Sequence, residues 1–129
     1  MIDASAVVEM LLRTPAGAAV ERHLEGASDV VAPELLDAEV LHALRRLVRE
    51  RKMTDRRAGV AVHRLSRLPV LRVSHQRLLI DAWQLRHNLS AYDALYVALA
   101  RRTGTSLLTL DRRIAGAPGL GASVTIVSV

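Results

Sequence analysis

Short apolar runs alternate with longer amphipathic segments along the chain. Most of the short runs are bounded by Gly, Pro, Ser or Asp, as buried strands are, and the longer segments repeat apolar residues at helical spacing. We predict strands at residues 1–3, 29–32, 70–73, 105–110 and 124–127. We predict helices at residues 5–12, 16–25, 33–52, 55–68, 75–87 and 91–102, with a short helix after Asp111. Apolar strands separated by helices indicate an α/β fold with a central, mostly parallel sheet of about five short strands.

Residues that usually cap helices stand at the expected boundaries. Ser5, Thr54 and Ser90 occupy N-cap positions, and Pro33 suits the first turn of the third helix. No repeat, linker or low-complexity segment interrupts the pattern. We therefore expect residues 1–129 to form one domain.

Composition excludes several classes of protein and site. Half of the residues are hydrophobic, which argues against disorder, and no apolar run reaches the roughly 18 residues of a membrane span. We see no basic-then-apolar leader and expect a cytoplasmic protein. Without cysteine there are no disulfides, thiolate zinc sites or thiol nucleophiles, and the five histidines form no ligand pair four residues apart. Three aromatic residues, Trp83, Tyr92 and Tyr96, are too few for a base-stacking platform.

The charge of the chain favours a polyanionic partner, since the net charge is +5 and the isoelectric point about 10.9. Arginine supplies seventeen of the eighteen basic residues, however, and a GC-rich genome would give this bias without any such partner. The clustering is harder to explain in that way. Seven basic residues lie between Arg45 and Arg57, against only Glu50 and Asp55, where a solvated surface would mix the signs more evenly.

Four carboxylates stand beside element boundaries or apolar helical runs: Asp3, Glu39, Asp93 and Asp111. Strand ends and helix starts of an α/β fold meet at one edge of the sheet, so we expect these side chains to converge. Almost no lysine or histidine accompanies them, and four such charges repel strongly unless a cation lies between them. Oxygen ligands suit Mg²⁺ or Mn²⁺, which is the outline of a metal-dependent phosphodiester hydrolase.

Each carboxylate also has a purely structural interpretation. Asp3 is the hardest to explain in this way, because a charge beside an apolar strand is costly unless it is used. Asp93 stands three residues after Ser90, which is the spacing of a capping box. Asp111 can cap the turn that follows its strand.

Spacing alone does not decide between two acids of the third helix. Glu39 lies beside the apolar stripe of that helix, where a carboxylate is usually a solvated edge residue, and Asp37 falls closer to the centre of the stripe. Members of the stripe are Leu36, Val40, Ala43, Leu44 and Leu47. From the residues themselves both acids remain candidates.

The order of these segments resembles the PIN domain family. Residues 1–5, Met-Ile-Asp-Ala-Ser, look like its first-strand motif, in which a hydroxyl follows the acid by two positions. Residues 33–46 resemble its second-acid helix, residues 89–100 its third-acid helix and residues 107–113 its fourth motif. The resemblance covers essentially the whole chain and implies a three-layer α/β/α PIN-like fold. Only two residues precede Asp3, fewer than family members usually have.

This resemblance implies roles for the acids. It selects Glu39, because Glu39 and not Asp37 matches the second acid of the family. It implies that Asp3, Glu39 and Asp93 hold one Mg²⁺ or Mn²⁺ ion. Asp111 would complete a second metal site or orient the attacking water.

Neighbouring residues receive roles as well. Ser5 either bonds the phosphate or a bound water, or is a plain helix cap. Thr109 would orient Asp111. Tyr92 is expected in the core.

Single-domain PIN proteins of this size are typically VapC-type toxins. The resemblance thus implies a metal-dependent endoribonuclease that inhibits translation, with transfer RNA as the first expected substrate and ribosomal or messenger RNA after it. It also implies a VapB-type antitoxin partner and a homodimer, with no membrane partner. We expect RNA phosphates to be bound by arginines of the basic cluster and of the metal edge, namely Arg49, Arg51, Arg56, Arg57, Arg112 and Arg113.

Three rival interpretations are weaker or remain open. A phosphoacceptor receiver domain needs a lysine near its last strand, and Lys52 is the only lysine. A phosphatase of the haloacid-dehalogenase type needs a second acid where Ser5 stands. A non-catalytic PIN-like module that binds RNA or protein stays open, and metal-dependent RNA cleavage would separate it from an enzyme.

Overall fold

A row of short parallel strands forms the centre of the computed structural model, which describes residues 1–116 and 124–126. The strands are β1 (Val31–Pro33), β2 (Leu71–Val73), β3 (Leu107–Thr109) and β4 (Val124–Ile126). Strand β1 pairs in parallel with β2, and β3 pairs in parallel with β4. Residues 1–3 join the two pairs, because Ile2 donates to the Val31 carbonyl at 3.2 Å and forms a parallel bridge with Leu108.

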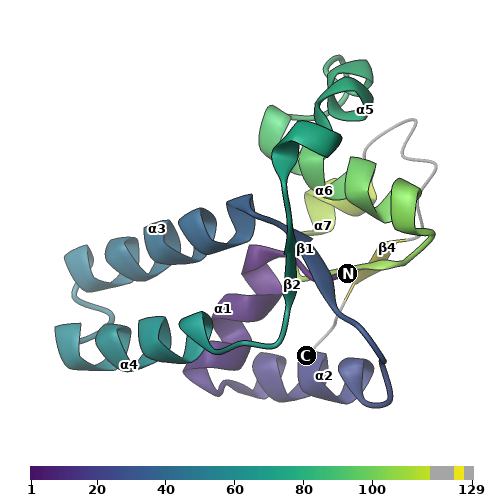
Figure 1. Cartoon of the computed structure of the whole chain (residues 1–129). Helices are drawn as coiled ribbons and strands as arrows, with labels where there is room; N and C mark the ends of the chain where they lie inside the picture. Colours follow the sequence, from purple (N-terminus) through teal and green to yellow (C-terminus); the bar gives the residue numbers. More distant parts are fainter. Residues whose placement is uncertain (117–123, 127–129) are drawn as a thin grey trace.

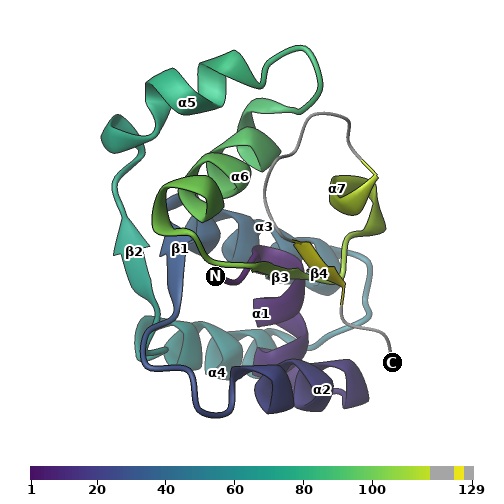
Figure 2. The ribbon, with the colours of Figure 1, turned by 90° about the vertical axis from the view of Figure 1, so that its right-hand side faces the viewer.

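Helices cover both faces of this row (Figures 1 and 2). They are α1 (Ala4–Leu12), α2 (Pro15–Leu24), α3 (Leu35–Arg49), α4 (Asp55–Ser66), α5 (Leu79–Gln84), α6 (Ala91–Thr103) and α7 (Arg112–Ala115), with a short 3-10 helix η1 (His75–Arg77). One apolar cluster lies under α1 to α4, and a second lies under α5, α6 and α7. The α/β class and its parallel sheet are confirmed, although the strands are shorter than we predicted.

Several predicted boundaries were wrong. Helix α1 begins at Ala4 and its N-cap is Asp3, so Ser5 is not the cap. Pro33 ends β1 and does not open the following helix, which begins at Leu35. The Glu34 amide donates to the Val73 carbonyl at 3.0 Å, so the pairing with β2 continues one residue past the proline. The predicted helix 75–87 divides into η1 and α5. Residue 127 of the last predicted strand lies outside the described residues.

Other boundaries follow the capping residues of the sequence. The Thr54 hydroxyl accepts the Arg57 amide at 3.2 Å, and the Ser90 hydroxyl accepts the Asp93 amide at 3.1 Å. Within the described residues, no helix is long and apolar enough to cross a bilayer.

Helices α1 and α2 approach closely at Gly17, which is buried. A Cβ atom added to Gly17 would overlap the backbone carbonyl of Glu9. Gly59 of α4 is also helical, but a Cβ atom there would meet nothing within 4 Å. The first glycine is therefore required by packing and the second is not.

We predict opposite effects of the same substitution at these two glycines. Gly17→Ala should lower the free energy of unfolding by about 1–3 kcal/mol, because backbone must shift to admit the methyl group. Gly59→Ala should raise it by about 0.5–1 kcal/mol, because alanine favours the helix. Urea denaturation of both variants checks this, and a destabilised Gly59→Ala would contradict the argument.

Candidate active site

Asp3 lies buried at the point where the first residues enter α1. Its side chain is only 5% exposed, and its Oδ1 atom accepts the Ala6 amide at 3.1 Å, which caps the helix. The same oxygen accepts the Ser5 hydroxyl at 2.7 Å, and Oδ2 accepts the Thr109 hydroxyl. Burial raises the pKa of Asp3, its hydrogen bonds oppose that rise, and the charge of Asp111 adds to it.

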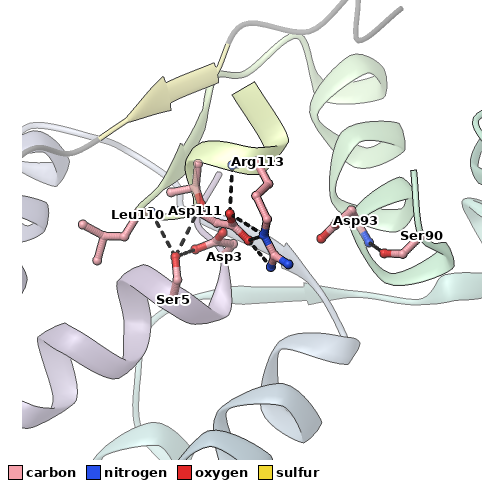
Figure 3. A network of polar contacts seen from close by, with 8 residues as sticks. Asp3, Ser5, Ser90, Asp93, Leu110, Asp111 and Arg113 are labelled. Atoms are coloured by element: carbon pink, nitrogen blue, oxygen red, sulfur yellow. Dashed lines mark hydrogen bonds and ion pairs between the residues drawn. The ribbon is translucent and has the colours of Figure 1, made fainter. Parts of the chain in front are cut away.

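Two hydroxyl groups fasten Asp3 to the end of β3. Ser5 Oγ accepts the Leu110 amide at 3.0 Å, and Thr109 Oγ1 accepts the Asp111 amide at 2.9 Å. Both hydroxyl protons point to Asp3 (Figure 3 shows the Ser5 contacts). Thr109 therefore supports the Asp111 backbone, while the carboxylate that it orients is that of Asp3.

Glu39 of α3 reaches across to α6. Its Oε2 atom accepts the Tyr96 hydroxyl at 2.7 Å. Burial raises the pKa of Glu39, the Tyr96 hydrogen bond opposes the rise, and the charges of Asp3 and Asp93 add to it. Burial and the neighbouring Glu39 hold the pKa of Tyr96 far above its ordinary value, so the phenol remains a donor. Tyr96 is a site residue that we did not predict from the sequence, where its one signal is its position one turn after Asp93.

Asp37 points to a different partner. It forms an ion pair with Arg72, with Nη2 and Oδ1 2.9 Å apart. Arg72 also donates to the carbonyls of Leu65, Leu68 and Val70, so it joins β2 to the end of α4. The structure thus gives Asp37 a role in packing and leaves Glu39 beside the other acids.

Asp93 keeps its carboxylate free for the site. Ser90 accepts the Asp93 amide, but within the described residues the Asp93 carboxylate accepts no hydrogen bond, so only half of the capping box forms. In Figure 3 the carboxylate points away from Ser90 and toward Arg113. Its neighbour Tyr92 is 60% exposed, so our prediction that Tyr92 belongs to the core was wrong.

Asp111 caps α7 and is paired with a cation. Its Oδ1 atom accepts the Arg113 amide at 2.9 Å, and Arg113 Nη2 lies 2.7 Å from Oδ2. The hydrogen bonds and charge of Arg113 hold the pKa of Asp111 below its ordinary value. Asp111 therefore differs from the other three acids, which have only neutral donors or none.

The four acids do not converge as closely as we expected. Within residues 1–116 and 124–126, no three acidic or histidine side chains are close enough to hold a metal ion. The charge of Asp3 nevertheless raises the pKa of Glu39, as does that of Asp93. This set offers only oxygen donors, with no lysine or histidine among them, and its chemistry fits a divalent cation.

An open cleft of about 680 Å³ lies between α1 and α3, and of the four acids Glu39 lines it. Its wall includes Ser5, Glu39 and Tyr92, then His42 and Arg46 farther along α3. The clustered arginines Arg49, Arg51, Arg56 and Arg57 are exposed where α3 joins α4, away from the acids (Figure 1). Arg112 and Arg113 are exposed on α7 beside the acids.

Comparison with known sequences assigns a family to this arrangement. A family model described as PIN domain matches residues 1–120. Ribonuclease VapC1 of Mycobacterium tuberculosis is 47% identical over 128 residues, which is 98% of this chain and 96% of that protein. Ribonuclease VapC12 of the same organism is 41% identical over 128 residues, 99% of this chain and 98% of that protein.

Solved structures show a similar fold. PAE2754 from Pyrobaculum aerophilum has a TM-score of 0.64 at 25% identity, over 95% of this chain and 80% of that one. Mycobacterium tuberculosis VapC20, described as a sarcin–ricin loop cleaving toxin, has a TM-score of 0.64 at 20% identity, over 90% of this chain and 94% of that one. The second likeness concerns the fold alone.

We predict that Asp3→Asn and Asp3→Ala separate the charge of Asp3 from its capping role. Asparagine keeps an oxygen for the Ala6 amide, whereas alanine should lose about 1–2 kcal/mol of stability with the cap. The raised pKa of Asp3 means that its ionised form costs stability, so the free energy of unfolding of the wild type should fall as pH rises through that pKa. The free energy of unfolding of Asp3→Asn should fall less over the same pH range.

Thermal unfolding across pH, with and without Mg²⁺, checks this prediction. Mg²⁺ should raise the melting temperature of the wild type and not that of Asp3→Asn, because the ion binds only the intact site. Equal stabilisation of both proteins by Mg²⁺ would remove Asp3 from the metal site.

Proposed function

The chain belongs to the PIN domain family and is of the VapC type, and from this membership we propose that it is a ribonuclease toxin that cleaves RNA with Mg²⁺ or Mn²⁺. The relatives VapC1 and VapC12 carry the name ribonuclease. The observation that carries the metal-dependent part is the charge coupling of Asp3, Glu39 and Asp93 across three elements. The negative charges of Asp3 and Asp93 raise the pKa of Glu39, so Glu39 has more to gain from a cation than an isolated carboxylate would have.

We assign the metal site to Asp3, Glu39 and Asp93, with Asp111 as the fourth acid. A bound divalent cation would supply Lewis-acid polarisation of the scissile phosphate. The residues around it hold the carboxylates. Ser5 and Thr109 fix the orientation of Asp3, and Tyr96 fixes that of Glu39, so these neutral donors position the ligands without cancelling their charge.

The RNA strand in this proposal follows the cleft beside α3. Glu39, His42 and Arg46 recur every three or four residues and therefore share one face of the helix. Arg46 lies about 10 Å along the axis from Glu39. Beyond it the exposed arginines of the α3–α4 tip continue the positive charge, which suits the phosphates of an RNA strand. Transfer RNA is our first candidate substrate and ribosomal RNA the second, both in the cytoplasm.

Two protein partners complete the proposal. A VapB-type antitoxin would cover the acidic site, where an inserted arginine would pair with the carboxylates. A homodimer would cover apolar side chains that are exposed on α5, namely Leu79 at 57%, Ile80 at 77% and Trp83 at 67%. The apolar surface of α5 is separate from the cleft between α1 and α3, because none of these three α5 residues lines that cleft.

We predict that purified protein cleaves RNA with Mg²⁺ and not with a chelator, and that Glu39→Gln loses this activity while Asp37→Asn keeps most of it. The loss of cleavage activity in Glu39→Gln should exceed the roughly 10–100-fold loss expected when a residue that only supports a metal ligand is removed. Asp37→Asn should cost at most about 1 kcal/mol of stability, because its ion pair is partly exposed and Arg72 keeps three carbonyl partners.

End-labelled RNA and urea denaturation measure the two effects. Reversed phenotypes would move the ligand from Glu39 to Asp37. RNA binding without cleavage by the wild type would favour the non-catalytic module over the enzyme.

We also predict that replacing the four tip arginines by glutamine weakens RNA binding. The substitutions are at Arg49, Arg51, Arg56 and Arg57. Each lost phosphate contact should flatten the log–log salt dependence of affinity by about 0.7–0.9. Cleavage at saturating RNA should change much less, because the tip lies away from the acids (Figure 1).

A control variant carries the same change of charge elsewhere. It replaces four other exposed arginines, namely Arg13, Arg22, Arg67 and Arg77. Titration of labelled RNA in Ca²⁺, at two salt concentrations, compares the variants. Equal loss in both would attribute binding to net charge, and no loss at the tip would place the RNA path beside α7 instead.

A further inference from the structure

Both carboxylate oxygens of Asp111 are engaged by one residue, Arg113. Oδ1 accepts the Arg113 amide at 2.9 Å and the guanidinium Nε at 3.1 Å. Oδ2 accepts Nη2 at 2.7 Å and Nε at 3.2 Å. In this arrangement the guanidinium covers the oxygens with which Asp111 would otherwise approach a cation.

The guanidinium lies toward the remaining acids. In Figure 3 it extends from α7 into the space between Asp111 and Asp93. The charge of Asp93 adds to that of Asp111 in stabilising the charged form of Arg113 and raising its pKa. The positively charged guanidinium of Arg113 thus lies among the carboxylates.

This ion pair can exchange its partner. The side chain of Arg113 is 88% exposed, and an exposed pair of this kind contributes little to stability. The planar fork of a guanidinium matches a phosphate as well as it matches a carboxylate. A phosphodiester bound at the neighbouring acids would therefore compete with Asp111 for the same donors.

We propose that Arg113 is a positioning residue which holds Asp111 away from the metal centre until an RNA phosphate takes over its guanidinium. Asp111 then joins the other acids, so that RNA and metal favour each other's binding. This inference rests on the proposed metal-dependent ribonuclease function. Such coupling is reciprocal, because whatever RNA adds to metal affinity, metal adds to RNA affinity.

The neighbouring arginine supplies a matched control. Arg112 has the same charge on the same short helix, and it forms no hydrogen bond or ion pair with the described residues. Arg112→Gln and Arg113→Gln remove one positive charge each at adjacent positions. Any difference between them reports the place of the Arg113 guanidinium beside Asp111 and Asp93 and not the net charge alone.

The first experiment titrates each protein with MnCl₂ in the absence of RNA, by calorimetry. Arg113→Gln should bind Mn²⁺ about two- to five-fold more tightly than Arg112→Gln, as expected for loss of an exposed ion pair. Arg113→Lys keeps the charge but not the fork, so its affinity should lie between those of the wild type and Arg113→Gln. Equal affinities of the two glutamine variants would overturn the proposal.

The second experiment measures the affinity of labelled RNA with and without Ca²⁺. The gain in RNA affinity on adding Ca²⁺ should be smaller in Arg113→Gln than in the wild type and should persist in Arg112→Gln. A gain that is unchanged in Arg113→Gln would overturn the proposal even if RNA binding is weaker overall.

The outcomes also separate this inference from the proposed function. If the wild type binds no Mn²⁺, or binds it as well after Asp3→Asn, the metal-dependent function fails. If Mn²⁺ binding requires Asp3 but the Arg112 and Arg113 variants agree, only the role of Arg113 fails. Thermal unfolding of each variant verifies that all of them fold.

Discussion

The hydrogen bonds of the Asp3 carboxylate connect the fold to the site. One oxygen caps α1, and the two hydroxyl groups that bind the carboxylate come from α1 and β3, more than a hundred residues apart in the chain. Because residues 1–3 also join the two pairs of strands, the same three residues complete the sheet and place the first acid. Loss of this contact would loosen α1 and the sheet edge together.

Ionising Asp3 and Glu39 lowers the stability of the fold. Burial, and after it the charges of neighbouring acids, raise the pKa values of Asp3 and Glu39, which means that the ionised forms destabilise the protein without a cation. Neutral donors limit this cost. Hydroxyl groups from Ser5, Thr109 and Tyr96 orient the carboxylates and leave their negative charge intact, whereas an arginine or lysine in those positions would neutralise it.

The sequence was informative where contacts are local. Periodicity located most helices, and Thr54 and Ser90 cap the helices that we expected them to cap. It was uninformative where a partner lies far away in the chain. Helical spacing did not decide between Asp37 and Glu39. What separates them is an ion pair of Asp37 with Arg72, 35 residues away, and a hydrogen bond to Glu39 from Tyr96, 57 residues away.

The Ser5 error has a related cause. Both Asp3 and Ser5 are good capping residues, and the choice between them depends on where residues 1–3 leave the sheet, which only the contacts with β1 and β3 determine. Asp111 is the opposite case, because its partner Arg113 is two residues away in the sequence. Asp3 and Glu39 are thus supported by neutral groups and Asp93 is left free, whereas Asp111 is supported by a local charge. Arg113 lies on an exposed short helix, so it can exchange Asp111 for another anion without disturbing the sheet. The hydroxyl groups that bind the buried Asp3 carboxylate cannot be released without disturbing it.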